Sequence, residues 1–290
     1  EISLGLVGSE MCIRDRIVSI EQLQELIINI RNLRKGFLTN FYLDKFKHSI
    51  WIEKGALFYI LIDETLFFLK KDIGFSNLFY CSTIVENLSR SLHLLLSSYS
   101  ETRFMIDAVG TSEQCQTIQT MLSNCQFNEY NKLIRMSRMT PQDDTFVLND
   151  KVEIGSIEDA NQVRELLLMN FDIKCEQIPY QEEIDQYAKD KRILVYKENS
   201  EVYGFVIFES NRSTHYLRYW FVHPEHRDKK IGSMLLNRFF YEGNNTRRQL
   251  FWVITNNENA IKRYRHYGFQ EEDLYDICLL YTSPSPRDRG

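Results

Sequence analysis

The sequence predicts an α/β protein made of two domains in tandem. About 260 residues remain once both ends are set aside, which exceeds the usual size of one domain. Strand-like apolar runs alternate with helical patterns, and nearly the same order of elements occurs twice. A polar stretch that begins with Thr140 and Pro141 separates the two patterned regions. We therefore predict domains at residues 17–139 and 151–277, with a linker at 140–150.

The two ends are set aside because one DNA element can encode both. Read in one orientation the element gives Leu6–Arg16, and its reverse complement in a shifted frame gives Cys278–Arg287. It resembles a transposon adaptor used in sequencing libraries. We therefore expect residues 1–16 and 278–290 to be adaptor-derived, so that neither natural terminus is known and the last strand is cut short.

Charge and cysteine usage exclude several classes of protein. The net charge is −5 and basic residues are grouped only locally, which argues against a general nucleic-acid binder. The four cysteines between the two ends form no CxxC pair and lie at no metal-ligand spacing from a histidine. No apolar run approaches the ~18 residues of a membrane span. We expect reduced thiols, a cytoplasmic location, no metal, and neither nucleic acid nor membrane as a partner.

In the first domain the signals alternate between helix and strand. Ser19 has the position of an N-cap, with Gln22 in the capping-box position ahead of an apolar face. The other expected elements are strands at 57–62, 66–69 and 78–81, a helix at 83–96, a strand at 103–109, a helix at 113–122 and a strand at 132–137.

The second domain repeats this order with clearer signals. Ser156 with Asp159 caps a predicted helix, and Pro224 ends the central strand that begins at Thr214. The other expected elements are a strand at 152–154, a helix at 178–188, strands at 193–196 and 202–209, a helix from 231, a strand at 249–255 and a helix from 257.

The corner inside Tyr216–Tyr241 carries the most chemistry. An aromatic strand passes into a basic turn with Arg227, Lys229 and Lys230, and then into a helix whose first turn contains Gly232. The first N–H groups of a helix have no intrahelical partner, and they lie at the positive end of the helix dipole. The corner therefore predicts a phosphate-binding site.

Two motifs of this half resemble the signatures of the GNAT N-acetyltransferases. The run Val222–Gly232, V-x-P-x-x-R-x-x-K-x-G, is similar to the acetyl-CoA loop of that family, Arg/Gln-x-x-Gly-x-Gly/Ala after a V-x-P strand end. The run Asn257–Phe269, N-x-x-A-x-x-x-Y-x-x-x-G-F, is similar to the second signature with its spacing intact. One position departs from the pattern, because Lys230 stands where the first loop glycine is usual.

The resemblance implies tandem GNAT-like acyl-CoA N-acyltransferase folds, each a central mixed sheet flanked by helices. The first domain has the same element order, but its corner Phe79–Ile84 contains neither glycine nor arginine. A helix start at Ser82 or Thr83 can bind an anion or can simply be capped. We interpret residues 17–139 as a degenerate GNAT-like domain that packs against the active half or shapes its substrate cleft.

The resemblance also implies acetyl-CoA as co-substrate. In GNAT folds the central strand diverges from its neighbour, and the unpaired backbone groups there bind the pantetheine arm. Lys230 keeps its N–H donor but lacks glycine's freedom at positive φ, and we expect the loop to tolerate it. The predicted cofactor-binding residues are Phe221, Val222, Arg227, Asp228, Lys229, Lys230, Ile231, Gly232, Ser233, Asn257 and Tyr264.

Aminolysis of a thioester needs a neutral amine, a donor for the developing oxyanion and a proton for the leaving thiolate. The resemblance gives Tyr264 the last role, as general acid; a phenol with a pKa of about 10 is protonated at working pH. Glu209 is the first candidate for the general base, with a solvated hairpin-end carboxylate as an equal alternative. Further candidates are His215, Tyr219 and His223.

These inferences predict an N-acetyltransferase that acts on a primary amine, in a small molecule or a peptide, by direct attack in a ternary complex. The alternative is a catalytically silent acyl-CoA sensor or scaffold, which Lys230 and the degenerate first half favour. A third possibility, aminoacyl transfer from a charged tRNA, conflicts with the absence of a broad basic surface. The sequence makes no prediction of the oligomeric state.

Overall fold

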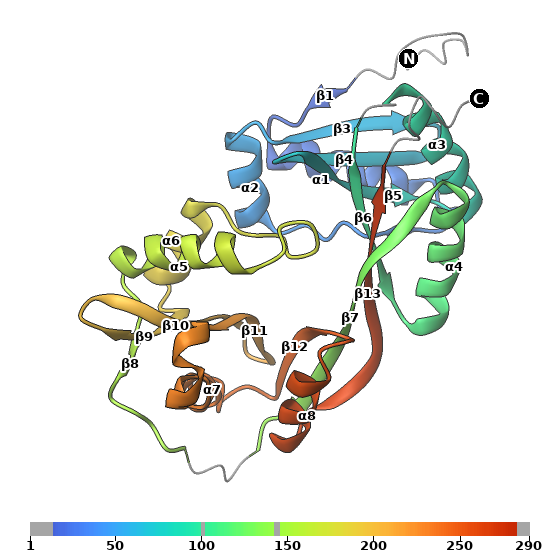
Figure 1. Cartoon of the computed structure of the whole chain (residues 1–290). Helices are drawn as coiled ribbons and strands as arrows, with labels where there is room; N and C mark the ends of the chain where they lie inside the picture. The colour runs from blue at the N-terminus through green and yellow to red at the C-terminus, as the bar shows by residue number, and fades with distance from the viewer. Residues whose placement is uncertain (1–13, 100–101, 142–145, 283–290) are drawn as a thin grey trace. The chain divides into compact units, whose positions relative to one another are not determined.

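The computed structural model describes residues 14–99, 102–141 and 146–282 (Figure 1). The chain divides into two compact units, unit 1 with residues 1–131 and 276–290, and unit 2 with residues 132–275. The division falls within strands β7 (Phe127–Met139) and β13 (Gln270–Tyr281), whereas the sequence analysis placed a linker at 140–150. The predicted domain limits stay a prediction.

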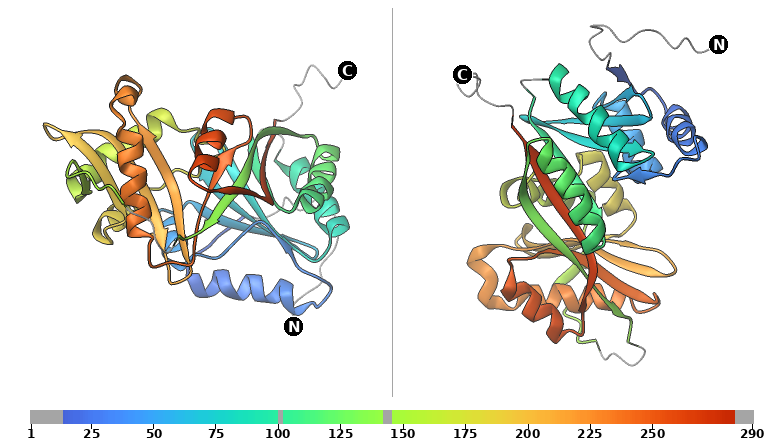
Figure 2. Two further views of the ribbon diagram at one scale, coloured as in Figure 1. Left: turned by 90° about the horizontal axis from the view of Figure 1, so that it is seen from below. Right: turned by 90° about the vertical axis from the view of Figure 1, so that its right-hand side faces the viewer.

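Unit 1 contains a mixed sheet with helices packed on it (Figures 1 and 2). Strands β3, β4 and β5 are antiparallel, and β5 is parallel to β6. Side chains on β4 and β5 are buried at successive positions, which requires cover on both faces of the sheet. The elements are β1 (Asp15–Arg16), α1 (Ile20–Asn32), β2 (Leu38–Thr39), α2 (Lys45–Glu53), β3 (Leu57–Ile62), β4 (Thr65–Asp72), β5 (Phe75–Ser82), α3 (Val85–Ser98), β6 (Phe104–Gly110) and α4 (Ser112–Asn124).

Helix starts in unit 1 follow the sequence signals in one case and depart from them in another. Ser19 caps α1, and its side chain accepts the N–H of Gln22, as predicted. The predicted cap of α3 is wrong, because Ile84 is the N-cap residue and makes no side-chain cap bond. Ser82 is the last residue of β5, and its hydroxyl is bonded to that of Thr65 at 2.7 Å.

The strands of unit 2 form a mixed sheet region with the strand order β7-β12-β11-β10-β9-β8. Only the β11–β12 pair is parallel among the strand pairs of this order within the described residues. The elements are β8 (Val152–Ile154), α5 (Ile157–Asn170), α6 (Gln181–Lys189), β9 (Ile193–Glu198), β10 (Glu201–Ser210), β11 (Thr214–Val222), the 3-10 turn η1 (Pro224–Lys229), α7 (Ile231–Glu242), β12 (Arg248–Ile254) and α8 (Glu258–His266).

The sheet of unit 2 lies between two helical layers. Val195 and Phe205 pack in one core cluster with α5 and α6. Their neighbours Leu194 and Val206 pack in the other cluster, with α7 and α8. Adjacent strand residues point to opposite faces, so this alternation defines an α5–α6 face and an α7–α8 face.

Strands β11 and β12 diverge partway along their length. Their parallel register runs only from the Thr214–Arg248 pair to the Leu217–Phe251 pair, while β11 continues to Val222 beside β10. A divergence inside a sheet leaves backbone N–H and C=O groups available for other partners. We call this opening between the two strands the unit 2 splay; the sequence analysis expected such an opening beside the central strand.

The part of the chain with a described structure includes little of the two ends that we expect to be adaptor-derived. Residues 14–16 contain β1, and residues 278–281 continue β13, with Cys278 and Leu279 buried. The remaining residues of the two ends, 1–13 and 283–290, lie outside the described ranges.

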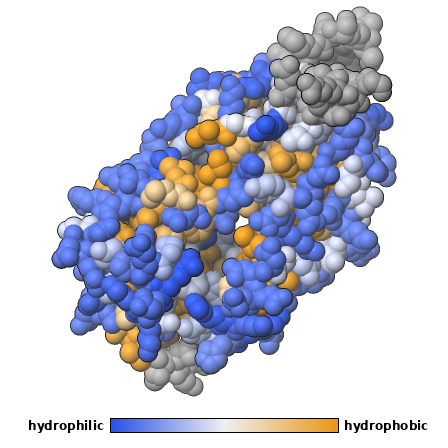
Figure 3. Space-filling view, in the orientation of Figure 1, coloured by the Kyte–Doolittle hydropathy of each residue, from blue (hydrophilic) through white to orange (hydrophobic). Residues whose placement is uncertain are grey.

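No described helix is long and apolar enough to span a membrane. The face of the molecule in Figure 3 carries mostly hydrophilic residues.

Candidate functional site

A pocket of about 390 Å³ lies in unit 2 beside the splay. It is formed by the end of β11, by the basic turn and the start of α7, and by the first turns of α8. Six residues of the predicted cofactor site line it, namely Phe221, Val222, Arg227, Gly232, Asn257 and Tyr264. Ala260 of the second motif also lines it, together with three residues that the sequence analysis did not single out, Trp220, Asn259 and Arg263. The two sequence motifs therefore meet at one pocket.

The basic turn ends in a residue with left-handed backbone. Lys230 has φ 58° and ψ 15° and is the N-cap residue of α7, with no side-chain cap bond. Glycine adopts this conformation without strain, which explains why the acetyl-CoA loop pattern that this run resembles usually has glycine at this position. The rest of the predicted loop lies next to the pocket, where Asp228, Lys229 and Ser233 are exposed and Ile231 is buried in the core.

Gly232 allows α7 to approach β11 closely. A Cβ atom at this position would lie 2.8 Å from Cζ2 of Trp220, closer than real Cβ contacts. The indole Nε1 of Trp220 is buried and has no hydrogen-bond partner among the described residues. An unpaired buried donor in a pocket wall is a group that a bound ligand can satisfy.

Tyr264 lies in α8 with its ring in the wall of the pocket. The ring centroid is 4.1 Å from that of Phe251 and 5.9 Å from that of Trp220. Its hydroxyl makes no hydrogen bond to a described residue, and burial raises the pKa of this phenol well above its ordinary value. The hydroxyl therefore stays protonated at neutral pH and can donate. Asn257 caps α8 by accepting the N–H of Ala260 at 3.2 Å.

Glu209 lies on the other face of the sheet from Tyr264. Its carboxylate accepts a hydrogen bond of 2.7 Å from the Tyr187 hydroxyl of α6 and lies 3.6 Å from Nε of Arg218. On this α5–α6 side, burial and the charge of Asp172 raise the pKa of Glu176 to about 7. The sequence analysis did not single out Glu176, which is a second candidate for a base near neutral pH.

The three further base candidates have structural partners. His215 is fully buried, its Nε2 lies 2.9 Å from the carbonyl of Phe239, and its Nδ1 is bonded to the Ser210 hydroxyl. Burial lowers the pKa of His215 to about 4, so the ring is neutral. The Tyr219 hydroxyl donates to the carbonyl of Gln177, and His223 accepts the N–H of Glu225. Glu209 and Glu176 are the carboxyl candidates for the base on the α5–α6 side.

A family model described as "Acetyltransferase (GNAT) family" matches residues 160–269. Residues 160–269 are a GNAT domain. The match covers the pocket, both sequence motifs and the splay, and members of this family transfer acyl groups. No curated protein matches the chain significantly.

Solved structures with a similar fold extend over both units. A tandem GNAT protein from the clavulanic acid biosynthesis pathway has a TM-score of 0.56 at 10% identity, covering 94% of this chain and 99% of that one. A GCN5-related N-acetyltransferase from Sphaerobacter thermophilus has a TM-score of 0.56 at 12% identity, with 94% and 96% covered. A glucosamine N-acetyltransferase region of a fungal multi-domain protein has a TM-score of 0.61 at 11% identity, with 93% and 38% covered. The predicted tandem GNAT fold is confirmed.

The GNAT pocket of unit 2 fits an acyl-CoA by three features of its own. The free start of α7 next to Arg227 suits a pyrophosphate, Gly232 keeps a cradle that a Cβ would fill, and Trp220 offers an unpaired donor. No group of three or more His, Cys, Asp or Glu residues in the described ranges is arranged to hold a metal ion.

The corresponding opening of unit 1 is filled by its own chain. The parallel register of β5 and β6 ends at the Leu78–Ile106 pair. Just beyond it, Asn40 donates to the carbonyls of Leu78 at 3.4 Å and Asp107 at 3.0 Å, and accepts the N–H of Tyr80 at 2.7 Å. Asn40 thus bridges β5 and β6 by hydrogen bonds to their backbone groups. In unit 2, the splay leaves the equivalent backbone groups available.

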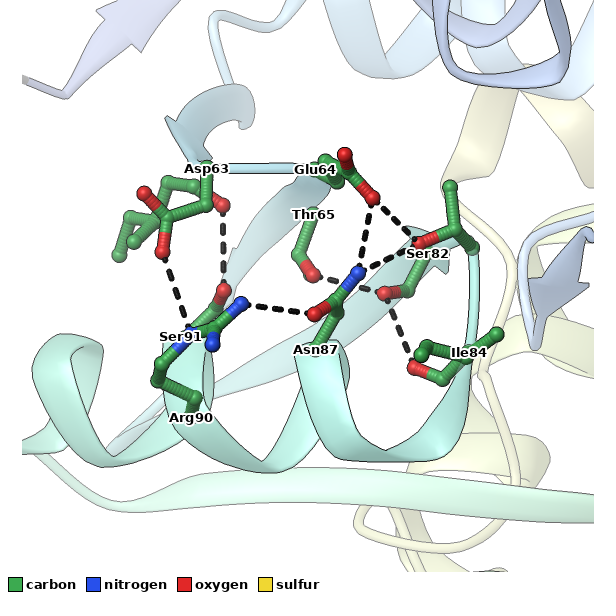
Figure 4. Close-up of polar contacts among 10 residues, drawn as sticks. Asp63, Glu64, Thr65, Ser82, Ile84, Asn87, Arg90 and Ser91 are labelled. Atoms are coloured by element: carbon green, nitrogen blue, oxygen red, sulfur yellow. Dashed lines mark hydrogen bonds and ion pairs between the residues drawn. The ribbon is translucent and has the colours of Figure 1, made fainter. Parts of the chain in front are cut away.

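A carboxylate lies beside the helix start of unit 1. Figure 4 shows Glu64, from the turn between β3 and β4, at the first turn of α3. Its Oε2 accepts hydrogen bonds from the side chains of Thr83 at 3.0 Å and Asn87 at 2.8 Å, and its Oε1 pairs with Lys35. The carboxylate of Glu64 therefore lies beside the start of α3. In unit 2, by contrast, the basic turn leaves the start of α7 free.

The left-handed Lys230 leads to a first prediction. A non-glycine residue in this conformation costs roughly 1–2 kcal/mol, and glycine returns about half of that gain through its greater unfolded-state entropy. Lys230→Gly should therefore leave the melting temperature unchanged or raise it slightly, and leave acetyl-CoA affinity unchanged or tighter. Lys230→Ala, which removes the charge and keeps the strain, is the matched control. A large loss of affinity in both variants would mean that the ammonium contacts phosphate.

Proposed function

We propose that unit 2 is an N-acetyltransferase that moves an acetyl group from acetyl-CoA to a primary amine by direct attack in a ternary complex. The observation that supports this most is the pocket at the splay, where both GNAT motifs and an unpaired indole donor converge. The general conclusion, acyl transfer by a GNAT domain, comes from the family match, and the acetyl group, the amine and the residue roles are the proposal.

The loop residues would hold the pyrophosphate of the co-substrate. Arg227 supplies a positive charge, and the N–H groups at Ile231 and Gly232 lie in the first turn of α7, where intrahelical partners are lacking. Beyond Leu217, backbone groups of β11 facing the splay would bind the pantetheine arm and polarise the acyl carbonyl. When bound, acetyl-CoA supplies a thioester carbonyl as the electrophile.

The proton steps divide between the two faces of the sheet. On the α5–α6 face, Glu209 takes a proton from the acceptor ammonium, so that the neutral amine forms the new N–C bond. On the α7–α8 face, Tyr264 donates its proton to the sulfur as the C–S bond breaks, so that CoA leaves as the thiol. The nitrogen loses its second proton to solvent as the amide forms, and solvent returns a proton to Tyr264. The raised pKa of Tyr264 keeps the phenol protonated before the reaction, so that its proton is available when negative charge develops on the sulfur.

Two observations favour a silent acyl-CoA sensor as a second candidate. Glu209 is already engaged by Tyr187 and Arg218, and Lys230 strains the loop. Release of CoA thiol over a panel of primary amines, beside an equilibrium titration with acetyl-CoA, separates the two functions. Turnover on at least one amine supports the transferase, and binding without turnover on any amine supports the sensor.

Free thiols at the described cysteines support a cytoplasmic location.

A further inference from the structure

A β-bulge places Arg218 at the mouth of the splay. In the β10–β11 pair Ile207 faces Tyr219 and Phe208 faces Leu217, so Arg218 is the extra residue of β11. Leu217 is also the last residue of β11 in register with β12. Arg218 is therefore the first side chain beyond the point where the two strands separate.

The contacts of Arg218 place it on the α5–α6 face. Its guanidinium carbon lies 5.5 Å from the ring centroid of Tyr216 and 5.8 Å from that of Tyr219. Its Nε lies 3.6 Å from Oε1 of Glu209, which also holds the Tyr187 hydroxyl of α6. This is the face opposite Tyr264, from which we propose that the acceptor amine arrives.

The two terminal nitrogens of the Arg218 guanidinium carry N–H donors that are available to a ligand. A guanidinium has five N–H donors in a planar fork, and the ion pair of Arg218 with Glu209 involves Nε. The two terminal nitrogens make no hydrogen bond to any residue in the described ranges, and the side chain is 23% exposed. Such a fork binds a carboxylate through two parallel hydrogen bonds.

The charges and the rigidity of the surroundings of Arg218 restrict the class of ligand that can bind there. Arg218 and Glu209 together are neutral, so a bound monoanion is balanced when the acceptor also brings an ammonium group, whereas a phosphate dianion is not. The phenols around Arg218 are held in place, since Tyr219 donates to Gln177 and Tyr187 to Glu209. A rigid wall lowers the entropy cost of binding a small polar acceptor.

From this geometry we propose that the acceptor amine carries a carboxylate, which Arg218 binds while Glu209 faces the amine. Amino acids and other amino carboxylates are the acceptor class that fits. The inference rests on the proposed function, because it names the acceptor of that same site.

The test compares pairs of amines that differ only by the carboxylate, such as 4-aminobutyrate with propylamine and phenylalanine with phenethylamine. In the wild type, kcat/KM should favour the carboxylate partner of a pair at least tenfold. Arg218→Gln should remove this preference, so that kcat/KM becomes similar for the two partners of a pair. Arg218→Lys, which keeps the charge without the fork, should retain part of the preference. Arg212→Gln, on the exposed β10–β11 turn, should keep all of it.

Dissociation constants of the same pairs, measured with CoA present, give a readout that needs no turnover. Preferential binding of the carboxylate partner that is lost in Arg218→Gln supports the inference even if no acyl transfer occurs, and the proposed function alone then fails. Equal binding of both partners by the wild type, or a preference that survives in Arg218→Gln with unchanged melting temperature, overturns it. If Arg218→Gln does not fold, the same comparison is made with Arg218→Lys, and a full preference there overturns it.

Discussion

Gly232→Asp is expected to raise the dissociation constant for acetyl-CoA by well over tenfold, or more than about 1.4 kcal/mol. The new Cβ would lie 2.8 Å from the Trp220 ring, which forces α7 away from β11 or the indole into the pocket. The carboxylate would also put a negative charge at a helix start that is proposed to hold pyrophosphate. Equilibrium titration with acetyl-CoA measures the change directly.

The steric and electrostatic parts of this effect can be separated. Gly232→Ala adds the Cβ alone and should weaken binding less than Gly232→Asp does. Melting temperatures of both variants show whether the fold survives the contact with Trp220. Unchanged acetyl-CoA binding in a folded Gly232→Asp variant would remove the basic turn and the start of α7 from the cofactor site.

Tyr264→Phe is expected to lower kcat while stability and acetyl-CoA affinity barely move. The change removes one hydroxyl and keeps the packing of the ring against Phe251 and Trp220. General-acid assistance is typically worth about 10²-fold or more, although thiolate is a good leaving group and the loss can be nearer tenfold. The measurement is steady-state turnover on the acceptor that the amine panel identifies.

A neighbouring tyrosine of the same segment provides the control. Tyr267 directly follows α8 and packs against Phe240, outside the pocket lining, so Tyr267→Phe should keep the full rate. A full rate in Tyr264→Phe would sink the general-acid assignment. A Tyr264→Phe variant that melts early would show instead that the hydroxyl satisfies a buried group.

Local signals in the sequence were sufficient for most elements. Ser156 and Asp159 form the predicted capping box of α5, and Asn257 caps α8 as the second motif suggested. The sequence analysis missed α2, whose consecutive buried residues Ile50–Ile52 break the helical spacing of apolar positions. The cap of α3 was misplaced because β5 runs on to Ser82, whose hydroxyl pairs with Thr65 on the neighbouring strand.

The candidate site was predictable where it depends on spacing along the chain. The two motifs fix the basic turn and Tyr264, and the fold brings them to one pocket. Trp220 could have been found from the same strand, since it alternates with Val222 toward the α7–α8 face. The bulge at Arg218 could not, because it depends on the register between β10 and β11.

Contacts between residues far apart in the sequence decide whether the strand opening and the helix start of unit 1 are occupied, so the sequence alone does not predict it. The filled opening depends on Asn40 reaching β5 and β6, residues far from it in sequence, and on Glu64 reaching Asn87 of α3. Neither side chain stands out by composition or spacing. The sequence alone therefore left open whether the start of α3 binds an anion or is simply capped.

We propose that the chain binds acyl-CoA once, in unit 2, because Asn40 and Glu64 of unit 1 already occupy its strand opening and the surroundings of its helix start. The most direct test is an equilibrium titration of the whole chain with acetyl-CoA. We expect one equivalent bound per chain in the wild type and, at concentrations that just saturate the wild type, only a small fraction of an equivalent in Gly232→Asp. Two equivalents in the wild type, or one that persists in a folded Gly232→Asp variant, would contradict it.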